Sequence, residues 1–320
     1  MPRRGHKVGM GTAMTLISFA AASPARASEL ARAISGDGWP SIRQLARQAA
    51  VRIGDPPAVY WTVGLGLLAA LVLVSVTPLL RGKPVPSPEG PRLANWATQR
   101  LLFAALVAAT IFGLRWPLFA PGLLNSDESH SIACAMKLAV DPVFWRGIDG
   151  TTGGPLLYYP LLLPKLFGWP LGYGAARAVG LAALIASALL LYGVVRRLFD
   201  EGIARVAVLP LVTFLALATG KHFTPYSSEQ IPVFLTTLGL YLLVRGWRQG
   251  GDSAVPLILC GLVLGTLPFA KLQSVPIGLF IAVCGVGVIG WRWLRSGDRL
   301  ASRLAMFVGS GFVASGIVLL

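Results

Sequence analysis

The sequence predicts an all-α protein, a polytopic bundle of about eight transmembrane helices. Of its 320 residues, 55% are hydrophobic and 13% are charged, and the mean hydropathy is +0.68. A soluble globular domain has about 25% charged residues. Several windows contain the roughly 20 apolar residues that a membrane-crossing helix needs, because hydrocarbon offers no water to the backbone polar groups. The composition therefore places this chain in a lipid bilayer.

The N-terminal segment has the three parts of a signal peptide. Basic residues come first, an apolar stretch follows over 8–22, and small residues stand before Ser28. This order is typical of a secretory signal, although an uncleaved anchor or a wrongly assigned start codon would fit equally well. We assign 1–27 to a signal peptide or uncleaved anchor and 28–57 to a short outward segment.

The rest of the chain alternates apolar and basic segments. We expect an extra transmembrane helix and a cytoplasmic loop over 58–97, and a transmembrane core over 98–320. The final apolar segment reaches Leu320 without a polar exit, which predicts a truncated chain. No internal repeat of fixed period is evident, so an inverted-repeat transporter has no support from the sequence. The eight expected spans are 58–80, 101–119, 174–194, 203–220, 230–246, 254–270, 274–294 and 304–320.

The basic residues predict the orientation of the spans. The formal net charge is +15, but the lysines and arginines stand in short tracts between apolar segments, as in cytoplasmic loops. We therefore expect no nucleic-acid partner. The positive-inside rule then places the loops at about 120–173, 221–229 and 271–274 on the outer side. The three cysteines have no metal-ligand or redox spacing.

Acidic residues in the outward loops are the first candidates for function. Ionised groups at a membrane boundary carry a free-energy penalty, so they usually have a functional role or an oppositely charged partner. We expect an interfacial helix over about 127–138, with its apolar residues on one side and its acids elsewhere. The outward acids are Asp127, Glu128, Asp141, Asp149 and Glu229. The apolar side is expected to comprise Ile132, Ala133, Met136 and Ala139.

A glycine-rich stretch follows this helix. The glycines and threonines from Asp149 to Pro155 predict a tight turn, at which the backbone could approach a ligand closely. A second interfacial segment with Tyr158 and Tyr159 comes next.

Four motifs stand in a fixed order along the chain. They are Asp127-Glu128, Gly154-Pro155-Leu156-Leu157-Tyr158-Tyr159, Glu229 at the start of a core helix, and the helix from Gly265 to Lys271. Their order resembles that in the GT-C glycosyltransferases of the protein mannosyltransferase and aminoarabinose transferase group, over about residues 98–294. The chain departs from the family pattern at Ser129-His130, where Arg-Tyr is common, and at Gly153-Gly154-Pro155, where Lys-Pro-Pro often precedes Leu-Tyr.

The resemblance implies a membrane glycosyltransferase that moves a sugar from a polyprenyl-phosphate donor to an acceptor hydroxyl on the outer face, with inversion. It makes Asp127 the general base, with Glu128 as a second catalytic candidate. The alternative role for Asp127 is helix capping by Ser126-Asp127, without catalysis. Glu229 and Asp149 are candidates for acceptor binding or for a second acid, and the acceptor is a lipid, a glycan or a protein.

Cations at outer helix ends are candidates for the donor phosphate. Lys271, Arg177 and Arg115 are expected there, either to stabilise the leaving phosphate or only to anchor the interface. Tyr158 and Tyr159 are interfacial aromatics that could stack on a sugar or an isoprenoid.

No cofactor is expected. A divalent ion held by Glu229 with His222 or His130 is the weaker alternative, since the histidines and acids lack a dense ligand spacing.

The main competing function is a transporter or lipid-carrier flippase, which would place acids within helices near the midplane. A purely structural membrane subunit ranks third. Membrane lipids are expected partners in each case. The signal-like start favours a bacterial inner membrane, with the site facing outward.

Overall fold

The computed structural model describes residues 57–80, 92–115, 119, 125–148, 150, 153–218, 225–248, 254–297 and 299–319. Within these ranges the chain forms α-helices and short 3₁₀ helices and no strand, which confirms the all-α prediction. The expected signal segment 1–27 and nearly all of the outward segment 28–57 lie outside the described residues.

Eight helices overlap the eight expected spans, but fewer than eight meet the length and hydropathy of a membrane span. Five of them are long and apolar enough to cross a membrane, namely α4, α5, α10, α14 and α15. The others fall short because α11 and α13 have 17 and 12 residues and α12 is not apolar enough. The bounds are α4 Pro57–Leu80, α5 Arg92–Arg115, α10 Tyr173–Leu198, α11 Glu201–Leu217, α12 Gln230–Arg248, α13 Val255–Thr266, α14 Val275–Ser296 and α15 Leu300–Leu319.

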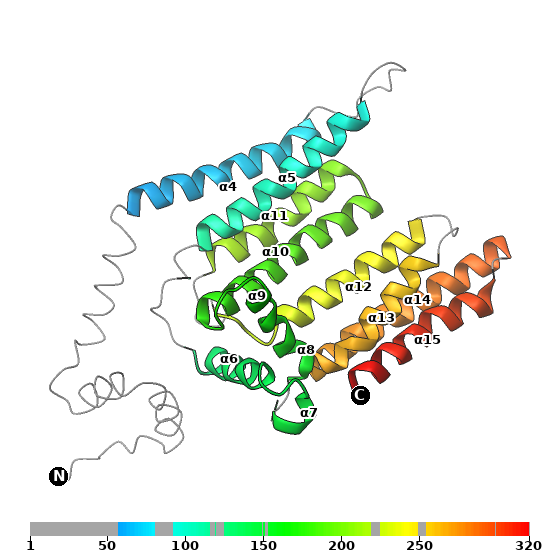
Figure 1. Cartoon of the computed structure of the whole chain (residues 1–320). Coiled ribbons are helices and arrows are strands. Elements are labelled where there is room, and N and C mark those ends of the chain that lie inside the picture. The colour runs from blue at the N-terminus through cyan, green and yellow to red at the C-terminus, as the bar shows by residue number, and fades with distance from the viewer. Residues whose placement is uncertain are drawn as a thin grey trace, which may run out of the picture. The chain divides into compact units, whose positions relative to one another are not determined.

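The long helices pack in two groups that meet between α10 and α12 (Figure 1). α4, α5, α10 and α11 surround one apolar cluster, and α12 to α15 surround another that includes the buried Cys260. Glycine permits the close contact between the groups. A Cβ atom at Gly180 of α10 would lie 2.0 Å from the side-chain oxygen of Gln230 on α12.

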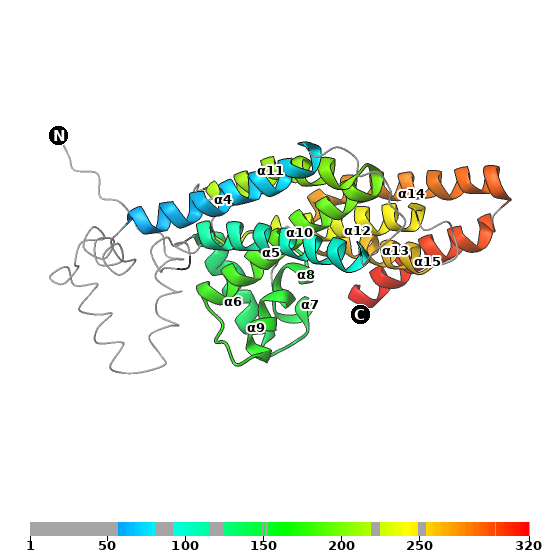
Figure 2. The ribbon, with the colours of Figure 1, turned by 90° about the horizontal axis from the view of Figure 1, so that it is seen from above.

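The short helices gather beside the N-terminal ends of α10 and α12, as two perpendicular views show (Figures 1 and 2). Their shared core includes Ile132, Leu138, Phe144 and Leu161, together with residues of α10 and α12. These elements are α6 Ser126–Leu138, α7 Phe144–Gly147, α8 Pro155–Tyr158, η2 Tyr159–Leu162 and α9 Leu163–Leu166. Two further 3₁₀ turns, η3 Leu267–Phe269 and η4 Leu272–Ser274, separate α13 from α14.

Helix α6 begins one residue before the predicted start, but its faces differ from the prediction. Asn125 is the N-cap, since its side chain accepts hydrogen bonds from the backbone N–H groups of Asp127 and Glu128. Ala133 and Met136, expected on the packed side, are exposed. Burial follows a different helical stripe, in which an acid is included because it is paired. The buried residues of α6 are Glu128, Ser131, Ile132, Cys134, Ala135 and Leu138.

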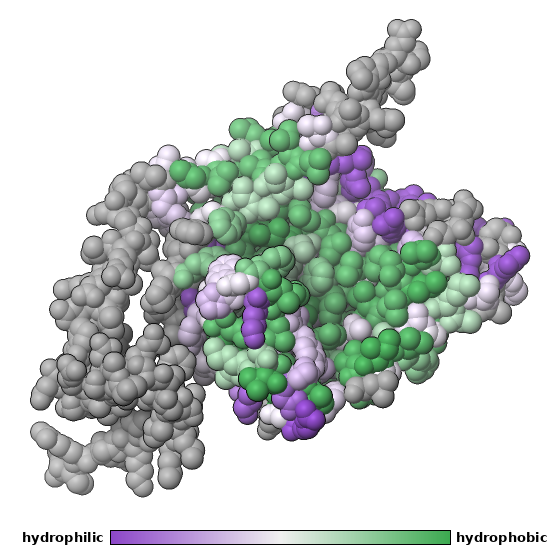
Figure 3. All heavy atoms as spheres, viewed as in Figure 1, coloured by the Kyte–Doolittle hydropathy of each residue, from purple (hydrophilic) through white to green (hydrophobic). Residues whose placement is uncertain are grey.

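Apolar side chains cover the outside of the long helices. In Figure 3 the visible face has a hydrophobic band between hydrophilic regions at the α6 end and at the opposite end of α10 and α11. Large side chains on this outer surface include Leu101 (71% exposed), Phe280 (69%) and Phe312 (75%). Such exposure is costly in water and favourable in lipid. The protein is therefore a multi-pass membrane protein.

Candidate functional site

The motif-bearing segments converge at the α6 end of the bundle. Residues from α6, α8, α10, the segment before α12, and the turn between α13 and α14 form a connected network of hydrogen bonds and ion pairs. These segments are up to about 140 positions apart in the sequence, so only the tertiary fold brings them together. We call this network the α6-end cluster and define it as Glu128, Gly153, Gly154, Leu157, Arg177, Tyr226, Ser228, Glu229, Ala270 and Lys271.

Glu128 and Arg177 form a buried ion pair at the centre of the cluster. The Arg177 Nε donates to Glu128 Oε1 at 3.0 Å, and Nη2 donates to Oε2 at 2.8 Å. The two side chains are only 0% and 6% exposed. Bidentate geometry of this kind is the strongest form of the arginine–carboxylate contact and compensates for desolvation. Sequence reasoning had placed both residues in the site but not as partners of each other.

Tyr226 extends this pair to two other segments. Its backbone N–H donates to Glu128 Oε1 at 2.9 Å, and its hydroxyl donates to the Leu157 carbonyl at 2.5 Å. The side chain is 1% exposed, and burial raises the pKa of its phenol. Tyr226 is therefore a neutral residue whose hydrogen bonds connect the segment before α12 to α6 and α8.

The glycine turn packs against the segment between α13 and α14, at the end of η3. Gly153 and Lys271 form a single antiparallel bridge, and the Gly154 N–H donates to the Ala270 carbonyl at 3.1 Å. A Cβ atom at Gly154 would lie 2.0 Å from the Phe269 carbonyl oxygen, so no larger residue fits without a backbone shift. The close backbone approach predicted from the glycines thus occurs against the chain itself.

Lys271 lies at the edge of the cluster and reaches the segment before α12. Its Nζ donates to the Ser228 hydroxyl at 2.8 Å and forms an ion pair with Glu229. The lysine side chain is 8% exposed, whereas that of Glu229 is 64% exposed. This pair therefore has one buried and one open partner, unlike the pair between Glu128 and Arg177.

Asp127 stands at the first turn of α6 with an exposed carboxylate. The Ser126 hydroxyl donates to its Oδ1 at 3.4 Å, and its backbone N–H is capped by Asn125 at 2.8 Å. Capping is thus performed by Asn125, not by the Ser126-Asp127 pair that the sequence suggested. The Asp127 carboxylate remains accessible next to the buried Glu128.

The two tyrosines expected near a ligand are engaged in packing. The Tyr158 ring is 2% exposed and stacks on Phe144, with centroids 5.6 Å apart. The half-buried Tyr159 donates its hydroxyl to the Pro142 carbonyl at 2.6 Å. Both rings therefore contribute to the core that holds α6, α7 and α8 together.

The remaining candidates are not brought into the cluster by any described contact. Arg115 is the last residue of α5 and is buried. Asp149 and His222 lie outside the described residues. His130 is exposed, with its Nε2 3.5 Å from the Cys134 sulfur. In the described ranges no group of three or more His, Cys, Asp or Glu side chains is arranged to hold a metal ion.

Tyr226 and Ser228 of the α6-end cluster and the adjacent Gln230 were not predicted as site residues, although they stand close to Glu229 in the sequence. Gln230 caps the same segment, with its amide nitrogen donating to the Pro225 carbonyl at 3.0 Å. Their only signal was a run of polar and aromatic residues at the start of an apolar helix. The hydrogen-bond partners of Tyr226 and Ser228 lie 43–98 positions away in the sequence, so local sequence does not reveal that these residues belong to the site.

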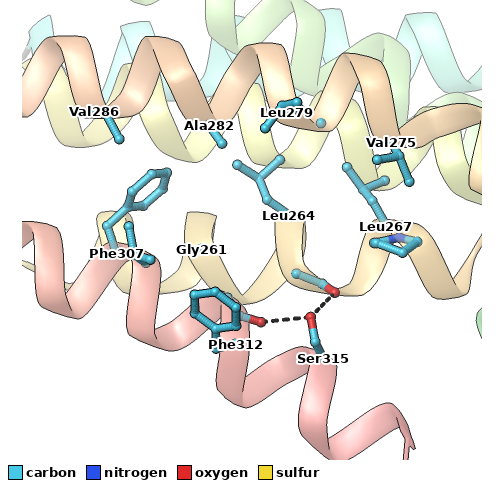
Figure 4. Close-up of a pocket in the computed structure, with 15 residues that line it drawn as sticks. Gly261, Leu264, Leu267, Val275, Leu279, Ala282, Val286, Phe307, Phe312 and Ser315 are labelled. Atoms are coloured by element: carbon cyan, nitrogen blue, oxygen red, sulfur yellow. Dashed lines mark hydrogen bonds between the residues drawn. The ribbon is translucent and has the colours of Figure 1, made fainter.

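An apolar cavity of about 280 Å³ lies between α13, α14 and α15 (Figure 4). Gly261 and Gly265 of α13 form its floor against α15, where the Ser315 hydroxyl donates to the Gly265 carbonyl at 2.8 Å. Leu267 and Pro268 line the cavity and immediately precede the Lys271 turn. Lys271 follows Pro268 by three residues but is not among the residues that line the cavity.

Comparisons with family models, with curated proteins and with solved structures found no match to this chain.

Proposed function

We propose that this protein is a membrane glycosyltransferase that moves a sugar from a polyprenyl-phosphate donor to an acceptor hydroxyl. The observation that carries the proposal is the α6-end cluster, in which an ion-paired lysine and a close-packed glycine turn meet at one end of an apolar bundle. The exposed Asp127 directly precedes Glu128 of this cluster. The motifs that resemble GT-C glycosyltransferases are the ones that meet there.

Asp127 is the general base of the proposed reaction. It takes the proton of the acceptor hydroxyl as that oxygen attacks the anomeric carbon, and the bond from this carbon to the donor phosphate breaks with its electron pair on the phosphate. Inversion results because the two oxygens lie on opposite faces of the sugar. The exposure of the Asp127 carboxylate supports this role, whereas Glu128, both of whose oxygens accept hydrogen bonds, has a positioning role.

Lys271 is the proposed partner of the leaving phosphate. The phosphate gains negative charge as the bond breaks, so a fixed cation stabilises the transition state more than the ground state. Since the present partner Glu229 is largely exposed, a phosphate can take its place on the lysine without unpairing a buried carboxylate. Arg177 is less suited, because it is committed to Glu128.

The apolar cavity between α13, α14 and α15 supports a lipid-linked donor. Isoprenoid chains carry no hydrogen-bonding groups, and the lining residues are almost all aliphatic, aromatic or glycine. The lining residue Pro268 precedes Lys271 by three positions, and in the proposed complex the apolar tail of the donor lies in the cavity while its phosphate binds the lysine.

The test is transfer of a labelled sugar from a polyprenyl-phosphate donor by the full chain in proteoliposomes. Donors with mannose, glucose and aminoarabinose and a mixed lipid, glycan and peptide acceptor pool would cover the sugar classes of the resembled group. We expect the Asp127→Asn variant to lose about 10²–10⁴-fold in rate, the usual contribution of a general base.

Asp141→Asn is the matched control, since this carboxylate is on the same segment but is paired with Arg146 outside the cluster. Equal rates for D127N and wild type would reject the base assignment. Vectorial movement of a donor or solute with no new glycosidic bond would favour the transporter function instead.

A further inference from the structure

A second groove lies at the opposite end of α10 from the α6-end cluster. It has a volume of about 500 Å³ and is bounded by α5, α10 and α12. Arg177 and Arg196 are 19 positions apart on α10, which corresponds to about 28 Å at 1.5 Å per residue. The groove is therefore separate from the proposed transfer site.

The groove has a basic end and an apolar body. Its lining residues include Arg100, Arg196 and Arg197 and no acidic residue. The apolar body is open to the outside of the bundle, since Leu101 on its wall is 71% exposed. The other apolar side chains of the body are Ala104, Ala186, Leu189, Leu190, Phe234 and Leu238.

Aromatic rings and carbonyls hold the arginines in place. The Arg197 guanidinium lies 4.4 Å from the centroid of the Tyr241 ring, and it donates to the Tyr241 hydroxyl at 2.9 Å and to the Gly193 carbonyl at 3.1 Å. Arg196 lies over the Tyr192 ring at 5.8 Å. These contacts are with neutral groups, so they orient the guanidinium groups without cancelling their charge.

The charge of this end is only partly compensated. Glu201 forms ion pairs with Arg100 and Arg205. Among the described residues, no carboxylate lies within ion-pair distance of Arg196 or Arg197. Two oriented guanidinium groups beside an open apolar groove therefore form a binding site for an anion that carries an apolar chain.

The length of the groove matches one leaflet of a bilayer. Ala186 and Arg196 are ten positions apart on α10, which is about 15 Å along the helix. Half of a hydrocarbon core of about 30 Å has the same thickness. A glycerophospholipid could thus place its phosphate on the arginines and one acyl chain along the aliphatic wall, as in basic pockets between transmembrane helices.

We propose that the groove between α5, α10 and α12 is a binding site for an anionic phospholipid, with Arg196 and Arg197 on the headgroup phosphate. The basic loops predicted on this side of the membrane agree with an anionic leaflet there. The occupant is a bilayer lipid, because a free phosphate would leave the apolar body of the groove unused.

Electron spin resonance of spin-labelled lipids in nanodiscs tests this site. The full chain is placed in phosphatidylcholine with a minor fraction of labelled phosphatidylglycerol or labelled phosphatidylcholine, and the motionally restricted fraction is measured. We expect the wild type to prefer phosphatidylglycerol, and R196Q to lower that preference about fivefold, the usual effect of one basic residue near a membrane surface. R196Q with R197Q lowers it further.

Arg245→Gln is the matched control, because this exposed arginine at the same end does not line the groove. Ala104→Trp fills the apolar body without removing a charge and is expected to reduce the restricted fraction of both lipids. Equal losses in R245Q and R196Q, or no preference in the wild type, would overturn the proposal. Complete competition by inorganic phosphate would assign the arginines to a free anion.

Discussion

Two ion pairs at the α6 end differ in the solvent exposure of their side chains. The side chains of Glu128 and Arg177 are 0% and 6% exposed, and the carboxylate also accepts from Tyr226. In the second pair, Lys271 is 8% exposed and Glu229 is 64% exposed. One pair is closed on all sides, and the other has an open carboxylate.

The difference separates residues that build the site from residues able to act in it. A buried pair must keep its geometry, because losing either partner leaves an uncompensated charge in a medium of low dielectric constant. A half-open pair can exchange its exposed member for another anion at little cost. In the proposed reaction, the buried pair therefore has a positioning role, and Lys271 and the exposed Asp127 contact the substrate.

The largest expected effect comes from breaking the closed pair. Arg177→Met leaves Glu128 buried and unpaired, and we expect a loss of about 3–5 kcal/mol in the free energy of unfolding. Thermal unfolding of the full chain in detergent would measure it. Glu128→Gln with Arg177→Met should recover part of the loss, because the amide oxygen can still accept from Tyr226. A double variant no more stable than R177M would contradict this account.

The next effect sharpens the comparison at the glycine turn that joins the two pairs. Gly154→Ala drives a Cβ atom into the Phe269 carbonyl, and overpacking of this kind costs about 1–3 kcal/mol. The control is Gly147→Ala, at which no heavy atom lies within 4 Å of the added Cβ. Equal unfolding temperatures for the two variants would show that η3 and the glycine turn are not in close contact.

A smaller stability effect is expected at the open pair. Glu229→Gln removes only a largely exposed partner of Lys271, so the free energy of unfolding should change by less than about 1 kcal/mol.

If the lysine binds the donor phosphate, Lys271→Met should lower transfer by about 10²-fold at saturating acceptor, the usual effect of losing one charge-stabilising donor. Lys271→Arg keeps the charge and should restore part of that rate. Equal rates in K271M and wild type would remove Lys271 from the site.

The smallest effect concerns the exposed pair between Asp141 and Arg146. The hydrogen bond donated by Arg146 lowers the pKa of Asp141 below its ordinary value of 3.8. The pair therefore contributes above about pH 4, and the contribution is lost as the pH falls through the lowered value. Arg146→Gln should raise the pKa of Asp141, as carboxyl carbon NMR would show. An unchanged titration would mean that the pair does not persist in solution.

The sequence predicted the helices better than the contacts among them. Apolar length located all eight long helices, and α6 begins within one residue of its expected start, because these features depend on neighbouring residues. The burial of Glu128 could not be predicted, since its partners Arg177 and Tyr226 are 49 and 98 positions away. Gly154 gave a correct signal of close approach, but its neighbour is the backbone of Phe269 and not a ligand.

The most direct test compares Asp127→Asn with Glu128→Gln, adjacent acids with opposite burial. For each variant, sugar transfer from a polyprenyl-phosphate donor is divided by the amount of folded protein in the same proteoliposomes. We expect D127N to unfold at the wild-type temperature and to lose transfer, and E128Q to unfold at a lower temperature and to keep more transfer per folded molecule than D127N. Full transfer by D127N together with loss of transfer by well-folded E128Q would reject Asp127 as the general base.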